Sequence, residues 1–110
     1  MNFLNFLKNF QVPPTITRIP SSDVIILNEG DSISVQCLTQ GNPMPHLTWS
    51  KRGEKADHTK IDDAKSTLNL QNVDVTHSDS YSCTANNDIG FPVTSEFQIL
   101  IRCKNLFFFN

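Results

Sequence analysis

Residues 79–87, DSYSCTANN, place a tyrosine two positions before a cysteine in a run where apolar residues alternate with polar ones. Tyr81, Cys83 and Ala85 therefore share one face of an extended strand, because successive side chains of a strand point to opposite sides. Helical periodicity is not sustained anywhere in the chain, whereas this two-residue period recurs. The sequence therefore predicts an all-β fold whose strands have one buried and one solvated face, as in antiparallel sheets.

Four further stretches alternate in the same way, at residues 31–39, 46–51, 66–73 and 93–101. Turn signals rich in Gly, Pro, Asn and Asp separate them at 28–31, 41–45 and 86–90, and short strands at such intervals indicate a sandwich or barrel. The stretch VPPTITRIP at 12–20 is expected to be extended, because its prolines suit an edge strand or a lead-in. The residues expected to point inward in the four stretches are Ile33, Val35, Cys37, Leu47, Trp49, Leu68, Leu70, Phe97, Ile99 and Ile101.

The bulk composition narrows the class of protein. A chain of 110 residues is long enough for one domain and too short for two with proper cores. A net charge of −2 argues against nucleic acid, since binding phosphates usually requires a basic face. No run approaches the 18 apolar residues of a membrane helix, and MNFLNFLKNF at the start lacks the pattern of a signal peptide.

Three spacings now fit one arrangement. Cys37 and Cys83 lie on inward faces of separate strands with 45 residues between them, Trp49 follows Cys37 by twelve positions, and Tyr81 precedes Cys83 by two. This arrangement resembles the immunoglobulin sandwich of two antiparallel sheets. The resemblance implies a disulfide between Cys37 and Cys83, a tryptophan buried against it, and a tyrosine corner whose hydroxyl returns to the backbone. Leu70 is expected in the same core.

Residues 12–101 resemble the I-set of immunoglobulin domains. EGDSISVQC at 29–37, GNPMPHLTWSKRG at 41–53 and DSYSCTANNDIG at 79–90 carry the match, with Ser80 standing where the family prefers glycine. Residues 12–49 are also similar to the second immunoglobulin domain of lachesin-like and IgLON-like neuronal adhesion proteins. That resemblance implies a cell-surface or secreted protein with several such domains in tandem, in which the second domain mostly spaces and orients the first.

We predict that the I-set domain covers residues 12–102, and that residues 1–11 and 103–110 are extensions outside it. Six of the eight phenylalanines lie in the first ten or last seven residues, among Leu, Asn and Lys. Our hypothesis is that these ends are translated intron or the flanks of a truncated gene model; the alternative is that they are real strands or a sticky tail. Three alternatives stay open for Cys103: it belongs to the non-native C-terminal end, it is a free thiol, or it pairs with another domain.

No catalytic, metal or cofactor site is predicted. His46, His58 and His77 are not at metal-ligand spacing, and Asp62 and Asp63 point in opposite directions as strand neighbours. Asp79 is expected to cap a turn or pair with a base such as Lys60.

The predicted function is therefore a non-enzymatic module for cell adhesion and protein recognition, acting as a spacer or contact domain. Its partners would be proteins, including another copy or related immunoglobulin proteins, and neither nucleic acid nor a small-molecule substrate. The paired cysteines favour an extracellular or cell-surface location, because disulfides persist in oxidising compartments. The alternative is an intracellular I-set module of a muscle or cytoskeletal filament. The candidate contact surfaces are a sheet edge at residues 92–100 and the hairpin at 86–90.

Overall fold

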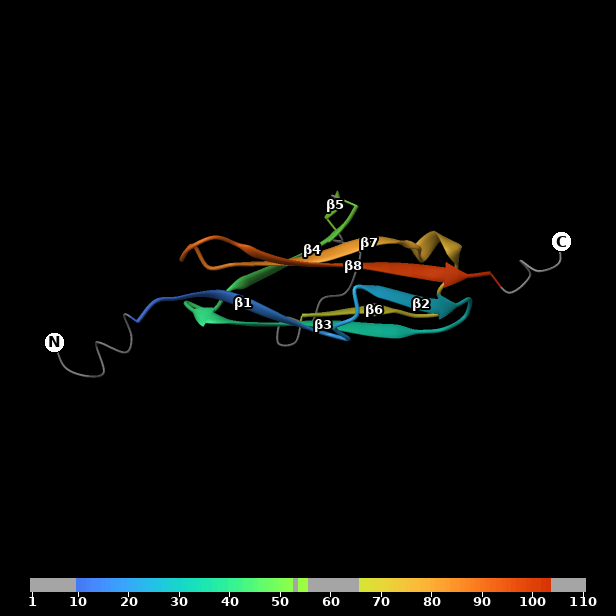
Figure 1. Ribbon diagram of the computed structural model, residues 1–110, viewed down its shortest axis with the longest axis horizontal. Coiled ribbons are helices and arrows are strands. Elements are labelled where there is room, and N and C mark those ends of the chain that lie inside the picture. The colour runs from blue at the N-terminus through green and yellow to red at the C-terminus, as the bar shows by residue number, and fades with distance from the viewer. Residues whose placement is uncertain (1–9, 53, 56–65, 104–110) are drawn as a thin grey trace.

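Two sheets pack face to face in the structure, a computed structural model that describes residues 10–52, 54–55 and 66–103 (Figure 1). One sheet has the strand order β1-β3-β6 and the other β2-β8-β7-β4-β5. The predicted all-β sandwich is confirmed. Its elements are β1 (Val12–Ile19), β2 (Val24–Asn28), β3 (Ile33–Asn42), β4 (His46–Lys51), β5 (Glu54–Lys55), β6 (Thr67–Leu70), a short 3-10 helix η1 (Val75–His77), β7 (Asp79–Asn86) and β8 (Val93–Arg102).

The core lies between the two sheets and contains most of the residues that the alternation predicts to point inward, together with Ile25 and Val73, which it did not predict. Phe97 is at its centre, with its ring stacked on Tyr81 at a centroid distance of 5.7 Å and edge-on to Trp49 at 6.3 Å. Aromatic pairs in these geometries contribute stability beyond the area they bury. The buried cluster consists of Ile25, Val35, Cys37, Trp49, Leu68, Leu70, Val73, Tyr81, Cys83, Phe97, Ile99 and Ile101.

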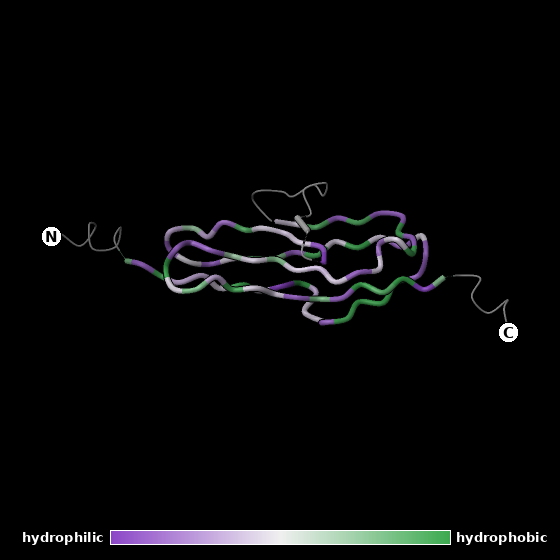
Figure 2. The backbone as a smooth tube through the Cα atoms, turned by 90° about the horizontal axis from the view of Figure 1, so that it is seen from above, coloured by the Kyte–Doolittle hydropathy of each residue, from purple (hydrophilic) through white to green (hydrophobic). Residues whose placement is uncertain are grey.

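The first two strands belong to different sheets. β1 pairs with β3 as an edge strand, as expected for residues 12–20, and the chain then crosses at residues 20–23 to the other sheet. There β2 pairs with β8 in parallel, from Val24 opposite Gln98 to Asn28 opposite Arg102. The two apolar runs lie side by side towards the C-terminus (Figure 2).

The parallel pairing of β2 with β8 differs from two expectations: that both sheets are antiparallel, and that residues 92–100 form a sheet edge. The other strand pairs are antiparallel, but the alternation within β2 and β8 carries no information about the relative direction of strands that are far apart in the chain. Residues 92–100 were also expected to form a sheet edge. This is wrong from Gln98 onward, because β2 covers that side of β8.

Candidate functional site

A disulfide between Cys37 on β3 and Cys83 on β7 connects the two sheets, with the two Cα atoms 6.7 Å apart. Both cysteines are buried, and Trp49 lies opposite Cys83 in the ladder between β4 and β7. Leu70 and Tyr81 belong to the same buried cluster. The structure thus brings together all five residues that the sequence singled out as the disulfide and core.

Tyr81 fixes the crossover from η1 to β7. Its hydroxyl donates a hydrogen bond to the carbonyl of His77 at 2.8 Å, the backbone return that the resemblance implies. Burial and the nearby charge of Asp79 raise the pKa of Tyr81 to about 12. A capping box stands at the start of η1. The Asp74 carboxylate accepts from the Thr76 N–H at 2.9 Å, and the Asp74 N–H donates to His77 Nδ1 at 3.0 Å.

Asp79 pairs with Arg52, whose Nε donates to its carboxylate at 2.9 Å, and the same oxygen accepts from the Ser80 N–H at 2.7 Å. Lys60, the partner suggested from the sequence, lies outside the described residues. Partial burial of Asp79 opposes its ionisation, but the hydrogen bonds from Ser80 and Arg52 outweigh this and lower the pKa of the carboxyl. The arrangement anchors the start of β7.

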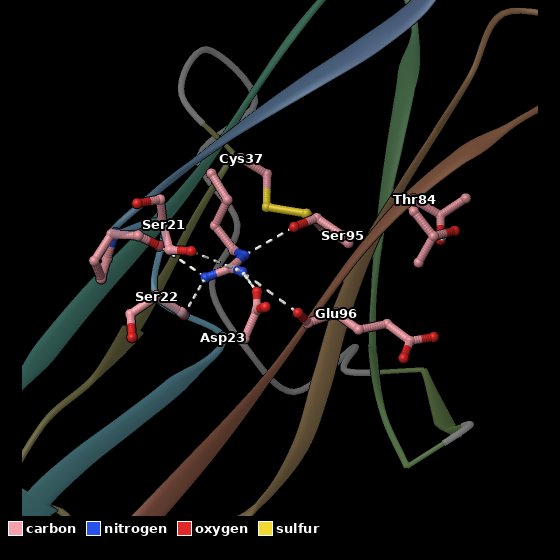
Figure 3. Close-up of a disulfide and its surroundings, with 11 residues drawn as sticks. Ser21, Ser22, Asp23, Cys37, Thr84, Ser95 and Glu96 are labelled. Carbon is pink, nitrogen blue, oxygen red and sulfur yellow. Dashed lines mark hydrogen bonds and ion pairs between the residues drawn. A yellow bond between two sulfur atoms is a disulfide. The ribbon is translucent and has the colours of Figure 1, made fainter.

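Arg18 is a buried charged residue that the sequence reasoning missed. Its side chain is 5% exposed, and its guanidinium carbon lies 4.9 Å from the centre of the Phe97 ring. The guanidinium donates to the crossover on one side and to β8 on the other. Figure 3 labels its partners Ser21, Ser22 and Asp23 of the crossover and Ser95 and Glu96 of β8. The acceptors are Ser22 O (2.7 Å), Pro20 O (2.8 Å), Ser95 Oγ (2.8 Å), Asp23 Oδ1 (2.9 Å), Ser21 O (3.4 Å) and Glu96 O (3.4 Å).

The two-residue period of β1 is a sequence signal for this network, because it puts Arg18 on the same face as Pro14 and Ile16. In β1, Pro14 and Arg18 are both buried and Ile16 is partly buried between them, so Arg18 occupies an inward position of the strand. A charged side chain is almost never buried without partners, and the turn that follows supplies carbonyls and one carboxylate. The network holds the crossover between the sheets in place.

Three segments far apart in the sequence meet at the end of the sandwich where β1 begins (Figure 1). We call residues 10–13, 41–45 and 86–92 the loop platform. Asn87 joins all three, since its Nδ2 donates to Val12 O at 2.8 Å and to Pro43 O at 2.9 Å. The side chain of Asn42 also donates to Phe10 O. The hairpin expected at residues 86–90 is part of this platform.

Local bonds fix the conformation of the platform loops. The Asp88 N–H donates to Asn86 Oδ1 and the Ile89 N–H to Asn87 Oδ1, both at 3.0 Å. Gly41 has a φ of +156°, and a Cβ there would lie 3.0 Å from Asn87 Nδ2 and 3.2 Å from Val12 O. A side chain at Gly41 would therefore push the Asn87 amide away from its acceptors.

Of the residues considered for catalysis, the structure describes His46 and His77, and it places them on different elements. His46 lies at the start of β4 and His77 at the end of η1, while His58, Asp62 and Asp63 fall outside the described residues. Within the described ranges, no three His, Cys, Asp or Glu side chains are grouped so that they could hold a metal ion. In the same part of the chain, no helix is long and apolar enough to cross a membrane.

The two sheets, the disulfide between them and the tyrosine bond define the class of an immunoglobulin-like sandwich. The family model for the immunoglobulin domain matches residues 13–87, and the chain belongs to that family. Known immunoglobulin domains are typically not catalytic.

A similar curated protein is MAM domain-containing glycosylphosphatidylinositol anchor protein 1 of Rattus norvegicus. It is 33% identical over 97 residues, which cover 87% of this chain and 10% of the relative. The chain therefore spans about a tenth of the length of the curated relatives it matches.

Two solved structures share the fold. A chain in the crystal structure of Dpr11 IG1 bound to DIP-gamma IG+IG2 has a TM-score of 0.66 and 27% identity, covering 84% of this chain and 49% of that chain. The titin domains Z1Z2 in complex with telethonin give a TM-score of 0.74 at 19% identity, covering 86% of this chain and 49% of that chain, a likeness of fold alone.

Proposed function

We propose that this chain is an extracellular immunoglobulin module that acts in cell adhesion and protein recognition, as a spacer or contact domain in a longer multi-domain polypeptide. The observation that carries the proposal is the buried disulfide between Cys37 and Cys83, which suits an oxidising compartment. The glycosylphosphatidylinositol anchor in the name of the similar curated proteins supports a cell-surface location. Their much greater length supports a module within a longer chain.

The partner we propose is a protein, either another copy of this chain or a related immunoglobulin protein. The similar Dpr11–DIP-gamma complex, in which immunoglobulin proteins bind each other, supports this class of partner. The bonded loops of the platform and the solvated face of the five-stranded sheet offer polar and apolar contacts of the kind such partners use. We propose neither a small-molecule substrate nor a nucleic acid.

The finer assignments belong to the same proposal. We assign the domain to the I-set and to the lachesin-like and IgLON-like group, and its boundaries to residues 12–102. The start of β1 at Val12 and the end of β8 at Arg102 support these limits. Residues 1–11 and 103–110 are then extensions of this domain, and Phe10 in the first of them accepts a hydrogen bond from Asn42. A continuous coding exon across either end in the transcript would contradict the hypothesis that the extensions are not native.

The test of the location is non-reducing peptide mapping of the protein from its source, with free thiols blocked at lysis. We expect Cys37 and Cys83 in one linked peptide, which places the chain in the secretory pathway. Recovery of both as blocked thiols would contradict the proposal. It would favour an intracellular filament module instead, a role for which the titin likeness supplies a fold precedent.

A further inference from the structure

The edge strand β1 turns part of its backbone away from its own sheet. The Cys37 N–H of β3 donates to the Ser66 carbonyl at 3.3 Å, so the backbone groups of Cys37 face β6 and not β1. Arg18 lies opposite Cys37 in the antiparallel ladder between β1 and β3. Residues directly opposite in such a ladder either exchange both of their hydrogen bonds or make none. The N–H and C=O of Arg18, and those of Ile16 two positions earlier, therefore point away from β3.

These backbone groups form an open strand edge. Within the described ranges, no hydrogen bond from outside the sheet reaches the N–H or C=O of Ile16 or Arg18. Pro14 and Pro20 have no N–H, and they limit the stretch with outward N–H groups to residues 16–18, which we call the open edge. An unpaired edge of this kind is a template for pairing with another strand. The open edge offers two N–H and two C=O groups, enough for four hydrogen bonds.

The side chains beside the open edge present no charge to a partner. Arg18 is the one charged residue of β1, and its guanidinium lies inside the sandwich, where acceptors of its own chain surround it. Edge strands commonly avoid pairing by exposing charged side chains, which β1 does not do. The outward side chains of β1 and of the paired stretch of β3 are Thr15, Thr17, Ile19, Gln36, Leu38 and Gln40.

The open edge is complementary to itself. A two-fold axis through Thr17 places Ile16 of one copy opposite Arg18 of the second copy, and each of these two pairs can exchange both of its hydrogen bonds. All four open groups of each copy are then bonded. The same axis places Pro14 opposite Pro20, so the positions that lack an N–H meet each other. Because the outer face beside the edge is uncharged, two copies that approach in this way do not repel one another.

We propose that two copies of this chain pair antiparallel through residues 16–18, which joins their three-stranded sheets into one continuous sheet. The inference rests on the proposed function as a protein-binding module, and it names another copy as the partner and β1 as the site. A contact of three residues per strand falls below the total buried area of about 1,000 Å² that stable interfaces exceed, so the pair is weak in dilute solution. Attachment of both copies to one membrane would raise their effective concentration and favour the pair.

The edge strand β2 of the other sheet is less suited to such pairing. The Val24 carbonyl accepts from Ser22 Oγ at 2.9 Å. At the other end, the Asn28 N–H donates to Asp31 Oδ2 at 2.9 Å and the Asn28 carbonyl accepts from the Asp31 N–H at 3.1 Å. Both ends of β2 are thus hydrogen-bonded within the chain, which leaves little backbone for strand addition around Ile26.

Disulfide trapping tests both the pairing and its register. In the proposed pair the two Thr17 residues lie directly opposite each other without hydrogen bonds between them, where Cα atoms are about 4.5 Å apart, within the span of a disulfide. The two Thr15 residues would lie four strand positions apart, about 13 Å, which is too far. With the free Cys103 replaced in every variant by Cys103→Ser, Thr17→Cys should form a covalent dimer in a glutathione buffer at least about tenfold faster than Thr15→Cys.

Hydrogen–deuterium exchange tests the pairing without a new cysteine. The amides of Ile16 and Arg18 should exchange more slowly as the concentration of the 110-residue chain rises, because the second copy accepts their hydrogen bonds. The Thr17 amide, which bonds to β3, should not change. Thr17→Lys should remove the concentration dependence, since it opposes two ammonium groups across the two-fold axis. Thr48→Lys is the matched control, because it makes the same change of charge at an exposed threonine of β4 in the other sheet and should keep the dependence.

Equal trapping rates for Thr17→Cys and Thr15→Cys would overturn the pairing through β1, and faster trapping of Thr15→Cys would overturn its register. Exchange at Ile16 and Arg18 that does not depend on concentration would also overturn it. Each of these results leaves the extracellular module intact, because that proposal is tested by the state of Cys37 and Cys83 in protein from its source. Recovery of those two cysteines as blocked thiols would contradict the module's location without touching the pairing of β1.

Discussion

Replacing Arg18 by alanine tests whether the buried guanidinium holds the crossover between the sheets. The substitution removes six hydrogen bonds to six different residues of the crossover and β8, one of them to the Asp23 carboxylate, together with the stack on Phe97. Four of these bonds are shorter than 3.0 Å. Each would contribute about 1.5–3 kcal/mol to the free energy of unfolding if no water replaced Arg18 at its acceptor.

The expected cost is smaller than the sum of those bonds. The side chain of Asp23 is 85% exposed, so its carboxylate regains water when Arg18 is lost and no unpaired charge remains buried. The crossover carbonyls next to it regain part of their hydration as well. We therefore expect Arg18→Ala to lower the free energy of unfolding by about 2–4 kcal/mol, which corresponds to a fall in melting temperature of about 10–25 °C for a domain of this size.

Urea unfolding followed by Trp49 fluorescence measures this change, and two further variants separate its causes. Arg18→Met keeps most of the packing on Phe97 and removes only the hydrogen bonds, so it should still cost at least 1 kcal/mol or so. Asp23→Asn removes one exposed charge and should cost less than about 1 kcal/mol. An Arg18→Met protein within about 0.5 kcal/mol of the unmodified chain would refute the view that these bonds hold the crossover.

Four other variants test the core and the β7 anchor. Cys37→Ala removes a cross-link that stabilises the fold by about 4 kcal/mol on the loop-entropy model, and Trp49→Ala costs about 3–5 kcal/mol. We expect neither variant to fold stably. A cooperative melt within a few degrees of the unmodified chain would contradict this. Burial raises the pKa of Tyr81 to about 12, above its unfolded value of 10.0. Because the folded state keeps this proton to a higher pH than the unfolded state, the free energy of unfolding should fall between pH 10 and 12. Tyr81→Phe should flatten that part of a curve of stability against pH. The pKa of Asp79 is lowered in the folded state, so its contribution to stability is present above about pH 4 and is lost as the pH falls further. Asp79→Asn should therefore weaken the dependence of stability on pH between pH 5 and 3, measured by urea midpoints.

The alternation of apolar residues was sufficient to predict the strands that form the core. Tyr81, Cys83 and Ala85 are all buried, as are Phe97, Ile99 and Ile101, because a strand packed on one side obeys the two-residue period. β2 was not predicted because its exposed positions, Val24 and Ile26, are themselves apolar, so the alternation of its burial does not appear in its sequence.

Contacts between distant segments were harder to predict than strands. Arg18 occupies an inward position of β1, but its acceptor Ser95 is 77 residues further along the chain. Asn87 likewise reaches Val12 across 75 residues. A turn sequence such as NNDIG predicts a local hairpin from its own residues, whereas the role of Asn87 as a junction depends on how both sheets place three loops together.

The positions of the chain ends bear on the spacer role that we propose. The polypeptide enters at the loop platform and leaves after β8 at the opposite end of the sandwich (Figure 1). A strand of ten residues such as β8 spans about 33 Å, so each module of this kind would separate its neighbours by roughly that length. Separation alone leaves the angle between modules free, because a linker transmits no orientation. The direction of a neighbouring module would therefore depend on a contact at the end surfaces of the sandwich.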